Sequence, residues 1–384
     1  YFFRCLKMEG YLAGLKRVIE PWYRALEDPE EAQNRVLTSL TGTYSKTAYG
    51  QAYCEGAISD VGEYRRRFPI VDYQGLKHWL DRVKDKGYQE LLSEPVIRWV
   101  MTRGTTGVPK VIPATRTHLE QVLMIGARGL VNHALRTGQH ELLTGGILNL
   151  NFPSTVHSEE TGRGRIEYGY SSGTYAKYNP RLGSVGLVPV QEEIDQLGSG
   201  ISRQDWERRF ELVYERARES DVRSVMGVTN VITSFGRYLK KRYSLAPKDI
   251  WRFRAAFCTS LPKIHTYHAP KIRALYGPAS IVEMYTATEG VFAQQLDDNP
   301  YVVPNYDAYF FEVVKGQKVK MLHELKRGEW GRLVISSCLF PRYDIGDYIE
   351  CAGKNFYRVF GRANKKVLLE HIMFNIFTGR IIRA

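Results

Sequence analysis

The chain has 384 residues, 43% of them hydrophobic and 12% aromatic, so it has ample material for a core and exceeds the usual size of a single one. No apolar run approaches the roughly 20 residues of a membrane-spanning helix, which excludes an integral helical membrane protein and indicates a soluble, globular one. The formal net charge of +13 comes from basic residues scattered along the sequence, whereas nucleic-acid binding as a main function requires a basic stripe or a recognisable binding module.

The first hundred residues are predicted to be helical. Residues 11–26 carry apolar side chains at helical spacing, and the Asp-Pro-Glu-Glu sequence at residues 28–31 is an N-terminal signal for a second helix that continues to Leu40. Strand-like apolar segments then alternate with helical ones, and this alternation predicts α/β architecture. We expect strands at residues 143–150, 222–229 and 281–285, and helices at residues 204–220 and 230–243.

The texture of the sequence changes after Tyr301, where short strands are separated by Gly, Lys and Asn turns. These strands are expected at residues 306–314, 317–322, 330–336, 348–351 and 355–359. They predict a mostly antiparallel subdomain. We therefore divide the chain into an α/β portion over residues 1–300, an antiparallel β subdomain over residues 301–364, and a tail over residues 365–384 without a clear period.

The cysteines are five in number, widely spread and without a CxxC pair. This usage argues against a zinc site and against a disulfide scaffold, and it favours a reducing cytoplasm. The chain begins at Tyr1 without a signal-peptide pattern, so we expect the true N-terminus to lie upstream.

The segment richest in chemistry is residues 102–110, Thr-Arg-Gly-Thr-Thr-Gly-Val-Pro-Lys, directly after an apolar run at residues 96–100. Its glycines let backbone N–H groups turn toward an anion, its threonine hydroxyls add donors and Lys110 adds a positive charge, so the loop can hold a phosphate. It is not a Walker A loop, because two residues instead of four separate Gly104 from Gly107 and a valine follows the lysine. An ordinary turn between strands is the alternative.

A second cluster, Tyr-Thr-Ala-Thr-Glu-Gly at residues 285–290, follows a predicted strand, where open α/β sheets bind ligands at the carboxyl ends of strands. There Glu289 could hold a magnesium ion, Thr288 could donate to a phosphate, and Tyr285 could present its ring to a base. The plain alternative for Glu289 is a solvated carboxylate.

Two further clusters lie near the end of the chain, at residues 342–347 and 360–364. The first places the Asp347 carboxylate directly after a glycine, which suits hydrogen bonds from a ribose diol. The second contains Arg362, which could reach a sugar or a phosphate. Both segments are also compatible with ordinary turns.

In order and spacing these four clusters resemble the motifs of the adenylate-forming superfamily, which includes acyl-CoA synthetases, luciferases and the adenylation domains of peptide synthetases. That superfamily carries a phosphate loop, a Tyr-x-x-Thr/Ser-Glu motif, a Tyr-x-x-Gly-Asp motif and a Gly-Arg hinge. Within it the chain is most similar to the acyl acid amido synthetases of the auxin-conjugating Gretchen Hagen type and their bacterial relatives. The flanks that carry this likeness are residues 33–53, 68–73, 110–113, 289–293 and 309–312, and the resemblance covers about residues 28–364.

The resemblance implies a fold and a reaction. The fold is the large N-terminal α/β domain of an adenylate-forming enzyme, with sheets flanked by helices and a mostly antiparallel β subdomain, and residues 365–384 begin a C-terminal lid or form an unplaced tail. The reaction is ATP- and Mg²⁺-dependent activation of a carboxylic acid as an acyl-adenylate, followed by transfer to an amine such as an amino acid. Because ATP is anionic, positive charge must neutralise it as the carboxylate attacks the α-phosphorus and pyrophosphate leaves.

The resemblance also assigns the site residues. The predicted site comprises Lys110 and Glu289 as catalytic residues, Glu289 also as magnesium ligand, Thr105, Thr106 and Gly107 at the ATP phosphates, Tyr285 and Thr288 at the adenine side and α-phosphate, and Asp347 and Arg362 at the ribose. The sequence departs from the family pattern at Arg103, where a small hydroxyl residue is usual, and at Asp344, where an arginine or another residue is common.

The acyl pocket and the second half-reaction are less specified by the motifs. We expect residues 168–173 and 225–235 to line the pocket, because aromatic and small residues together shape an apolar cavity with a few polar anchors. We assign no catalytic base among His118, His157 and His268. Two alternatives stay open, a CoA ligase of the phenylacetate type and a non-catalytic nucleotide-binding protein.

Overall fold

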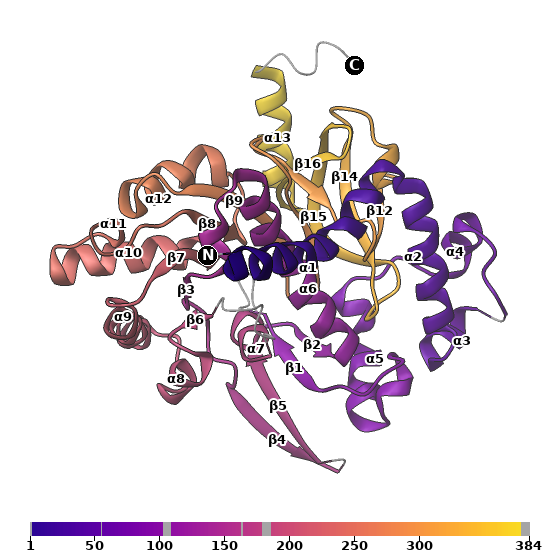
Figure 1. The fold of residues 1–384 in the computed structure, drawn as a ribbon. Coiled ribbons are helices and arrows are strands. Elements are labelled where there is room, and N and C mark those ends of the chain that lie inside the picture. The colour runs from indigo at the N-terminus through magenta and orange to yellow at the C-terminus, as the bar shows by residue number, and fades with distance from the viewer. Residues whose placement is uncertain (1, 55, 103–108, 163, 179–185, 378–384) are drawn as a thin grey trace. The chain divides into compact units, whose positions relative to one another are not determined.

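The computed structural model describes residues 2–54, 56–102, 109–162, 164–178 and 186–377 (Figure 1). The chain forms two compact units, the first from Tyr1–Pro21 and Val96–Pro300, the second from Trp22–Pro95 and Tyr301–Ala384. The second unit thus resumes at Tyr301, where the texture of the sequence changes, and it also includes an N-terminal segment. The domain boundaries expected from the sequence stay a prediction. Within the described ranges no helix has both the length and the apolar character needed to cross a membrane.

The first unit is built on a parallel sheet with strands in the order β9-β8-β7-β3-β6. Strand β10 then returns antiparallel to β9. The strands are β3 (Gly146–Leu148), β6 (Leu187–Val188), β7 (Val222–Val228), β8 (Ala255–Thr259), β9 (Ser280–Ala287) and β10 (Gly290–Gln295). All of β8 is buried, as expected of a parallel strand covered on both faces.

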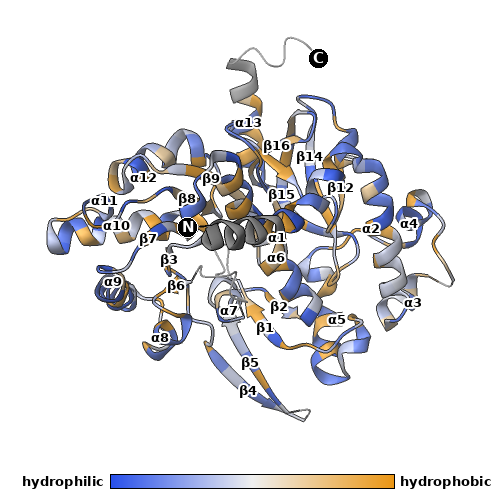
Figure 2. Ribbon diagram, viewed as in Figure 1, coloured by the Kyte–Doolittle hydropathy of each residue, from blue (hydrophilic) through white to orange (hydrophobic). Residues whose placement is uncertain are grey.

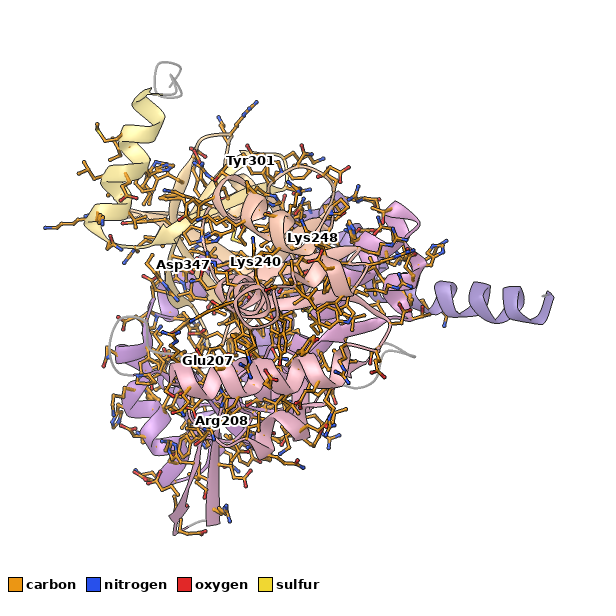
Figure 3. All side chains as sticks on the ribbon, turned by 90° about the vertical axis from the view of Figure 1, so that its left-hand side faces the viewer. Glu207, Arg208, Lys240, Lys248, Tyr301 and Asp347 are labelled. Carbon is orange, nitrogen blue, oxygen red and sulfur yellow. The ribbon has the colours of Figure 1, made fainter. Side chains whose placement is uncertain are left out.

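The first unit also contains the following helices. They are α6 (Arg116–Thr137), α7 (Ser171–Lys177), α8 (Gln191–Gln196), α9 (Arg203–Ala217), α10 (Thr229–Tyr243), α11 (Pro247–Ile250) and α12 (Ala269–Tyr276), with a π-helix, η3 (Ile264–His268), before α12. Helix α9 is mostly hydrophilic in Figure 2 and buries Phe210 and Val213 in the core. Figure 3 shows its Glu207 and Arg208, which are exposed, as is Lys240 at the end of α10. The sequence predicted an amphipathic helix for residues 204–220 and a helix for residues 230–243, and both helices are present.

A smaller sheet in the same unit has the order β2-β1-β5-β4. Its strands are β1 (Arg98–Met101), β2 (Val111–Ala114), β4 (His157–Thr161) and β5 (Gly164–Tyr170). Strands β1 and β2 pair as a hairpin, so the Gly/Thr-rich loop connects two antiparallel strands. Helix α6 follows β2 at once, and the side chain of its N-cap, Thr115, accepts a hydrogen bond from the His118 amide.

The second unit contains an antiparallel sheet with strands in the order β13-β12-β14-β15-β16-β11. The strands are β11 (Val302–Pro304), β12 (Phe310–Lys315), β13 (Lys318–Met321), β14 (Trp330–Ser336), β15 (Tyr343–Gly353) and β16 (Phe356–Arg362). The helices are α2 (Pro29–Tyr44), α3 (Ala48–Tyr53), α4 (Val61–Arg67), α5 (Tyr73–Asp85) and α13 (Lys365–Phe377), while α1 (Phe2–Glu27) contributes to both units. The predicted fold class, α/β with a mostly antiparallel β subdomain, is confirmed.

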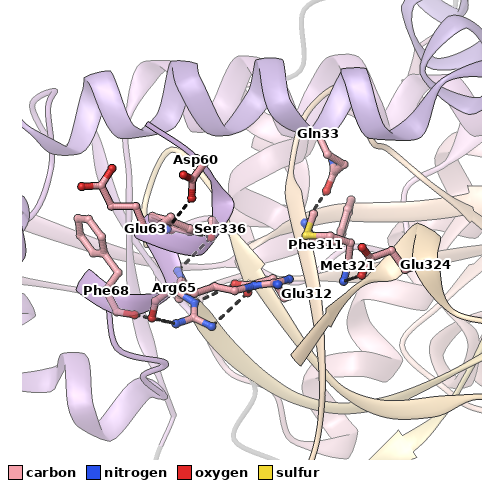
Figure 4. Close-up of polar contacts among 12 residues, drawn as sticks. Gln33, Asp60, Glu63, Arg65, Phe68, Phe311, Glu312, Met321, Glu324 and Ser336 are labelled. Carbon is pink, nitrogen blue, oxygen red and sulfur yellow. Dashed lines mark hydrogen bonds and ion pairs between the residues drawn. The ribbon is translucent and has the colours of Figure 1, made fainter. Parts of the chain in front are cut away.

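Buried polar side chains hold the helices of the second unit to its sheet (Figure 4). The Gln33 amide donates to two backbone carbonyls and accepts from the Phe311 amide at 2.7 Å. The fully buried Glu312 carboxylate accepts from Arg342 at 2.9 Å and from Arg65 of α4 at 2.8 Å. The Arg342 guanidinium in turn donates to the carbonyls of Arg65 and Phe68. A charge buried this completely is tolerated because each partner is hydrogen-bonded.

Two expectations about the elements differ from the structure. The strand expected at residues 143–150 is limited to Gly146–Leu148, because the preceding His140–Leu143 form a 3₁₀ helix. Residues 343–347, which are compatible with a turn, begin the long strand β15 instead. The φ angle of +80° at Gly346 allows the bend within that strand without ending it.

Candidate functional site

The Gly/Thr-rich loop is closed at its base by two hydrogen bonds. The Thr102 amide donates to the Lys110 carbonyl at 2.9 Å, and the Lys110 amide donates to Thr102 Oγ1 at 2.9 Å. The β1–β2 ladder therefore extends to the two ends of the loop. Arg103 and the predicted phosphate ligands Thr105, Thr106 and Gly107 lie outside the described residues.

The second motif is a tight hairpin between β9 and β10. Ala287 pairs with Gly290, so Thr288 and Glu289 form the turn, and the register shifts by a bulge between Val291 and Ala293. Bulges of this kind change the direction of side chains near functional sites. Tyr285 still lies inside β9 rather than after it, and its ring centroid is 5.6 Å from that of Phe292.

The turn brings Glu289 to the loop lysine. Lys110 Nζ lies 3.9 Å from Glu289 Oε1, and the carboxylate is the less exposed partner, with 7% of its side chain exposed against 32% for the lysine. The cation can approach a phosphate and the carboxylate can hold a metal ion. Two predicted catalytic residues are thus adjacent.

A single carboxylate fits a magnesium ion of the kind that phosphate substrates carry. Within the described ranges no group of three or more His, Cys, Asp or Glu side chains could hold a metal by itself. Magnesium does not require such a group, because it is usually held by one or two carboxylates together with substrate phosphates and water. Glu289 at the turn therefore suits that role.

Two residues to which the sequence gave no role contact this turn. The Tyr175 hydroxyl of α7 donates to the Thr288 carbonyl at 2.6 Å, and His118 Nε2 of α6 lies 3.1 Å from the same hydroxyl. His118 is completely buried, and burial lowers its pKa to about 4. The contact to Thr288 is made through a backbone carbonyl, which leaves no motif in the sequence.

A titratable pair between Glu283 of β9 and His265 of η3 was also missed by the sequence. Burial raises the pKa of Glu283 to about 7, and His265 Nε2 lies 3.4 Å from Glu283 Oε2. The pKa of His265 is lowered, mainly by burial. Because side chains alternate along a strand, Glu283 and Tyr285 lie on the same face of β9. Perturbed acids of this kind are frequent at functional sites.

The two predicted ribose ligands lie in the second unit, opposite each other on β15 and β16. The register pairs Asp347 with Arg362, and Arg362 Nε lies 3.3 Å from Asp347 Oδ1. The guanidinium also donates to the Ile345 carbonyl at 2.8 Å. Asp347 is buried, whereas 55% of the Arg362 side chain is exposed. A carboxylate can accept several hydrogen bonds, which is the property that the predicted ribose role requires.

Asp344, at which the sequence departs from the family pattern, has a local structural role. Its carboxylate accepts from the Gly346 amide at 2.9 Å and lies 3.0 Å from Arg332 of β14. It therefore stabilises the bend that precedes Asp347 and links the two strands.

The segments expected to line an acyl pocket have structural partners in the described contacts. A Cβ on Gly169 would lie 1.8 Å from the Ser154 carbonyl oxygen, and one on Gly173 would lie 2.0 Å from that of Phe152, so both positions require glycine. The Tyr170 ring packs against Phe152 in the core. Within residues 225–235, the buried residues of the same core are Val225, Val231, Ile232 and Phe235. The pocket assignment stays a prediction.

Comparison with known proteins shows where this chain is similar to others. Residues 19–194 match the model of the GH3 family N-terminal domain. The chain is 28% identical over 94 residues to the indole-3-acetic acid-amido synthetase GH3.15 of Arabidopsis thaliana, a match that covers 24% of this chain and 16% of that protein. It is 29% identical over 134 residues to the probable indole-3-acetic acid-amido synthetase GH3.7 of Oryza sativa subsp. japonica, which covers 32% and 22% of the two chains.

Solved structures show the fold over most of the chain. The structure of the AtGH3.15 acyl acid amido synthetase in complex with 2,4-DB superposes with a TM-score of 0.75 at 13% identity, covering 92% of this chain and 71% of that one. An open conformation of 2-hydroxyisobutyryl-CoA ligase in complex with 2-HIB-AMP and CoA has a TM-score of 0.58 at 14% identity, covering 92% and 75%. The resemblance read from the motifs is confirmed: residues 19–194 match the GH3 N-terminal domain model, and the fold is similar to those of an acyl acid amido synthetase and an acyl-CoA ligase.

Proposed function

We propose that this chain activates a carboxylic acid with ATP as an acyl-adenylate and transfers the acyl group to an amine such as an amino acid. The observation that carries the proposal is the Lys110–Glu289 pair, a cation and a carboxylate 3.9 Å apart on two separate motifs of the adenylate-forming pattern. The GH3 domain match and the fold support the same class of reaction.

Each residue has a role that follows from its charge and position. Lys110 stands at the end of the Gly/Thr-rich loop, where its ammonium would neutralise phosphate oxygens as the carboxylate attacks. Glu289 would hold Mg²⁺, which supplies positive charge against the leaving pyrophosphate when it is bound. Thr288 would donate to the α-phosphate, and Tyr285 would face the adenine. In the second unit, Asp347 would accept from the ribose hydroxyls and Arg362 would contact the sugar.

The second substrate separates the two enzymatic alternatives. The sequence relatives are named as amido synthetases, and this favours an amine over a thiol as the acceptor. The similarity to 2-hydroxyisobutyryl-CoA ligase keeps a CoA ligase as the second candidate, because the adenylation half-reaction is shared. We place the reaction in a reducing cytoplasm, consistent with the free thiols of Cys54, Cys258, Cys338 and Cys351.

Carboxylate-dependent ATP–pyrophosphate exchange tests the proposal. A panel of acids should reveal at least one that supports exchange, and mass analysis of the products with amino acids or with CoA should then identify an amide. Absence of exchange with every acid would contradict acid activation, and a thioester in place of an amide would favour the CoA ligase.

The role of Glu289 is tested in the same assay. Glu289→Gln keeps the shape and removes the charge, so it should lose most of the exchange activity without losing the fold. Glu141→Gln is the matched control, because Glu141 forms an ion pair with Arg254 at 2.7 Å in the same unit and has no proposed part in the reaction. Wild-type exchange by Glu289→Gln at limiting magnesium would show that the metal role is wrong.

A further inference from the structure

The turn that carries Glu289 is held by a side chain from outside the hairpin. The Tyr175 hydroxyl donates to the Thr288 carbonyl oxygen at 2.6 Å, a short and therefore strong bond for this type. Thr288 is 7% exposed, so little water competes for that carbonyl. The carbonyl belongs to the peptide that joins Thr288 to Glu289, and its direction sets where the Glu289 side chain begins.

Two ladder pairs lie beside the turn, Ala287 with Gly290 and Thr286 with Val291, and the register shifts beyond them, between Val291 and Ala293. A bulge disrupts the ladder locally and leaves the extra residue unpaired. The regular part of the ladder next to the turn is therefore short, and the bond from Tyr175 to the Thr288 carbonyl adds a contact from outside the hairpin.

His118 contacts the Tyr175 hydroxyl and restricts its position. His118 Nε2 lies 3.1 Å from the Tyr175 hydroxyl, and the two rings meet edge-on with centroids 5.9 Å apart. The tyrosine has a single hydroxyl hydrogen, which the Thr288 carbonyl accepts. The hydrogen-bond network thus assigns the hydrogen of the histidine to Nε2, which lies beside the tyrosine oxygen. His118 also hydrogen-bonds to the Thr288 backbone, so both side chains support this turn.

We propose that Tyr175, backed by His118, is a positioning residue that holds the Thr288–Glu289 turn so that the Glu289 carboxylate faces Lys110. The expected effect of Tyr175 on activity rests on the proposed function. Its effect on the conformation of the Thr288–Glu289 turn does not. Neither Tyr175 nor His118 touches the reacting atoms in this scheme. They act through the backbone of Thr288.

Tyr175→Phe tests the inference, because it removes one oxygen and keeps the ring. Tyr276→Phe is the control, since the Tyr276 hydroxyl also donates to a backbone carbonyl in the same unit, that of Ile232, at 2.7 Å. By hydrogen–deuterium exchange, the amides of residues 288–291 should exchange about 10-fold faster in Tyr175→Phe, which corresponds to the loss of one hydrogen bond, and at the wild-type rate in Tyr276→Phe.

The activity readout separates positioning from general stability. Tyr175→Phe should raise the half-saturating magnesium concentration several-fold and leave the KM for the acid unchanged. In a Glu289→Gln background, Tyr175→Phe should have no further effect on the rate of ATP–pyrophosphate exchange, because Tyr175 acts only through Glu289. If Tyr175→Phe fails to fold, His118→Gln, which keeps a donor, and His118→Leu, which removes it, should differ in the same two readouts.

The outcomes distinguish this inference from the proposed function. The positioning role would be overturned if hydrogen–deuterium exchange at residues 288–291 were unchanged in Tyr175→Phe. It would also be overturned if Tyr175→Phe and Glu289→Gln had fully additive effects on the rate of ATP–pyrophosphate exchange. A wild-type protein without exchange activity on any acid would overturn the proposed function, and hydrogen exchange would still decide whether Tyr175 holds the turn.

Discussion

Asp347→Ala should weaken AMP binding by about 10- to 150-fold. The substitution removes the carboxylate that is proposed to accept from the ribose, and the loss of one charge-assisted contact costs roughly 1.5–3 kcal/mol, where about 1.4 kcal/mol corresponds to a factor of ten. The side chain of Asp347 is 11% exposed, so water only partly replaces the lost acceptor. The expected loss therefore lies within that interval rather than near zero.

The effect on affinity can be separated from an effect on stability. Asp347 is paired with Arg362 at 3.3 Å, but 55% of the arginine side chain is exposed, and such a pair stabilises the fold by less than about 1 kcal/mol. The Asp347→Ala protein should therefore remain folded at the temperature of the binding assay. Removing the aspartate also frees Arg362, so an Arg362→Ala double-mutant cycle measures how far the two act as one unit.

Titration calorimetry with AMP is the assay, and Glu350→Ala is the control. Glu350 lies on the same strand and is paired with Arg358 of β16 at 2.5 Å, so its removal deletes the same charge from β15 at a position three residues beyond the proposed ribose contact. Glu350→Ala should lower the free energy of unfolding and leave AMP affinity close to that of the parent. Equal AMP affinity of Asp347→Ala and the parent would refute the ribose assignment.

Two further predictions concern stability. Glu312→Gln should lower the free energy of unfolding by about 3–5 kcal/mol in urea titrations, because it leaves the buried Arg342 guanidinium without its counter-charge, and a loss below 1 kcal/mol would contradict this account. The pKa of His118 is lowered in the folded state from 6.5 to about 4, so the unfolded chain binds the proton first as the pH falls. This difference in proton binding should lower the free energy of unfolding by up to about 3 kcal/mol as the pH falls from 6.5 to 4, and it should have no effect above pH 6.5. Unfolding curves of His118→Asn should lack this part of the pH dependence.

The parts of the fold that follow local patterns could be predicted from the sequence. Helices α9 and α10 carry apolar residues at helical spacing, and β14 coincides with the predicted segment 330–336. Where the prediction differs, tertiary pairing overrides a local signal. The Gly-Asp sequence at the start of β15 is typical of a turn, but pairing with β14 on one side and β16 on the other keeps it in the sheet.

The sequence predicted those residues of the candidate site that belong to recognisable motifs. It did not predict a residue that contacts the site through a backbone group. Lys110 and Glu289 were expected to act together, and the structure places them side by side. Asp347 and Arg362 were both expected, but their mutual ion pair depends on the register of two strands, which the sequence does not specify. Tyr175 was missed because its partner is a carbonyl oxygen, a group that every residue carries.

Both candidate pairs, one in each unit, join a cation to a carboxylate. The Lys110–Glu289 separation of 3.9 Å lies at the outer limit of an ion pair, and the Arg362–Asp347 pair is half-exposed on its cationic side. Such pairs are worth at most about 1 kcal/mol each, so a ligand displaces them at little cost, whereas each charge-assisted contact that replaces them contributes roughly 1.5–3 kcal/mol. Before a ligand binds, however, each pair restricts the rotamers of its two side chains. The same weak contacts therefore lower the side-chain conformational entropy that is lost when a ligand binds. On the proposed function, this preorganises Lys110 for phosphate and Asp347 for ribose.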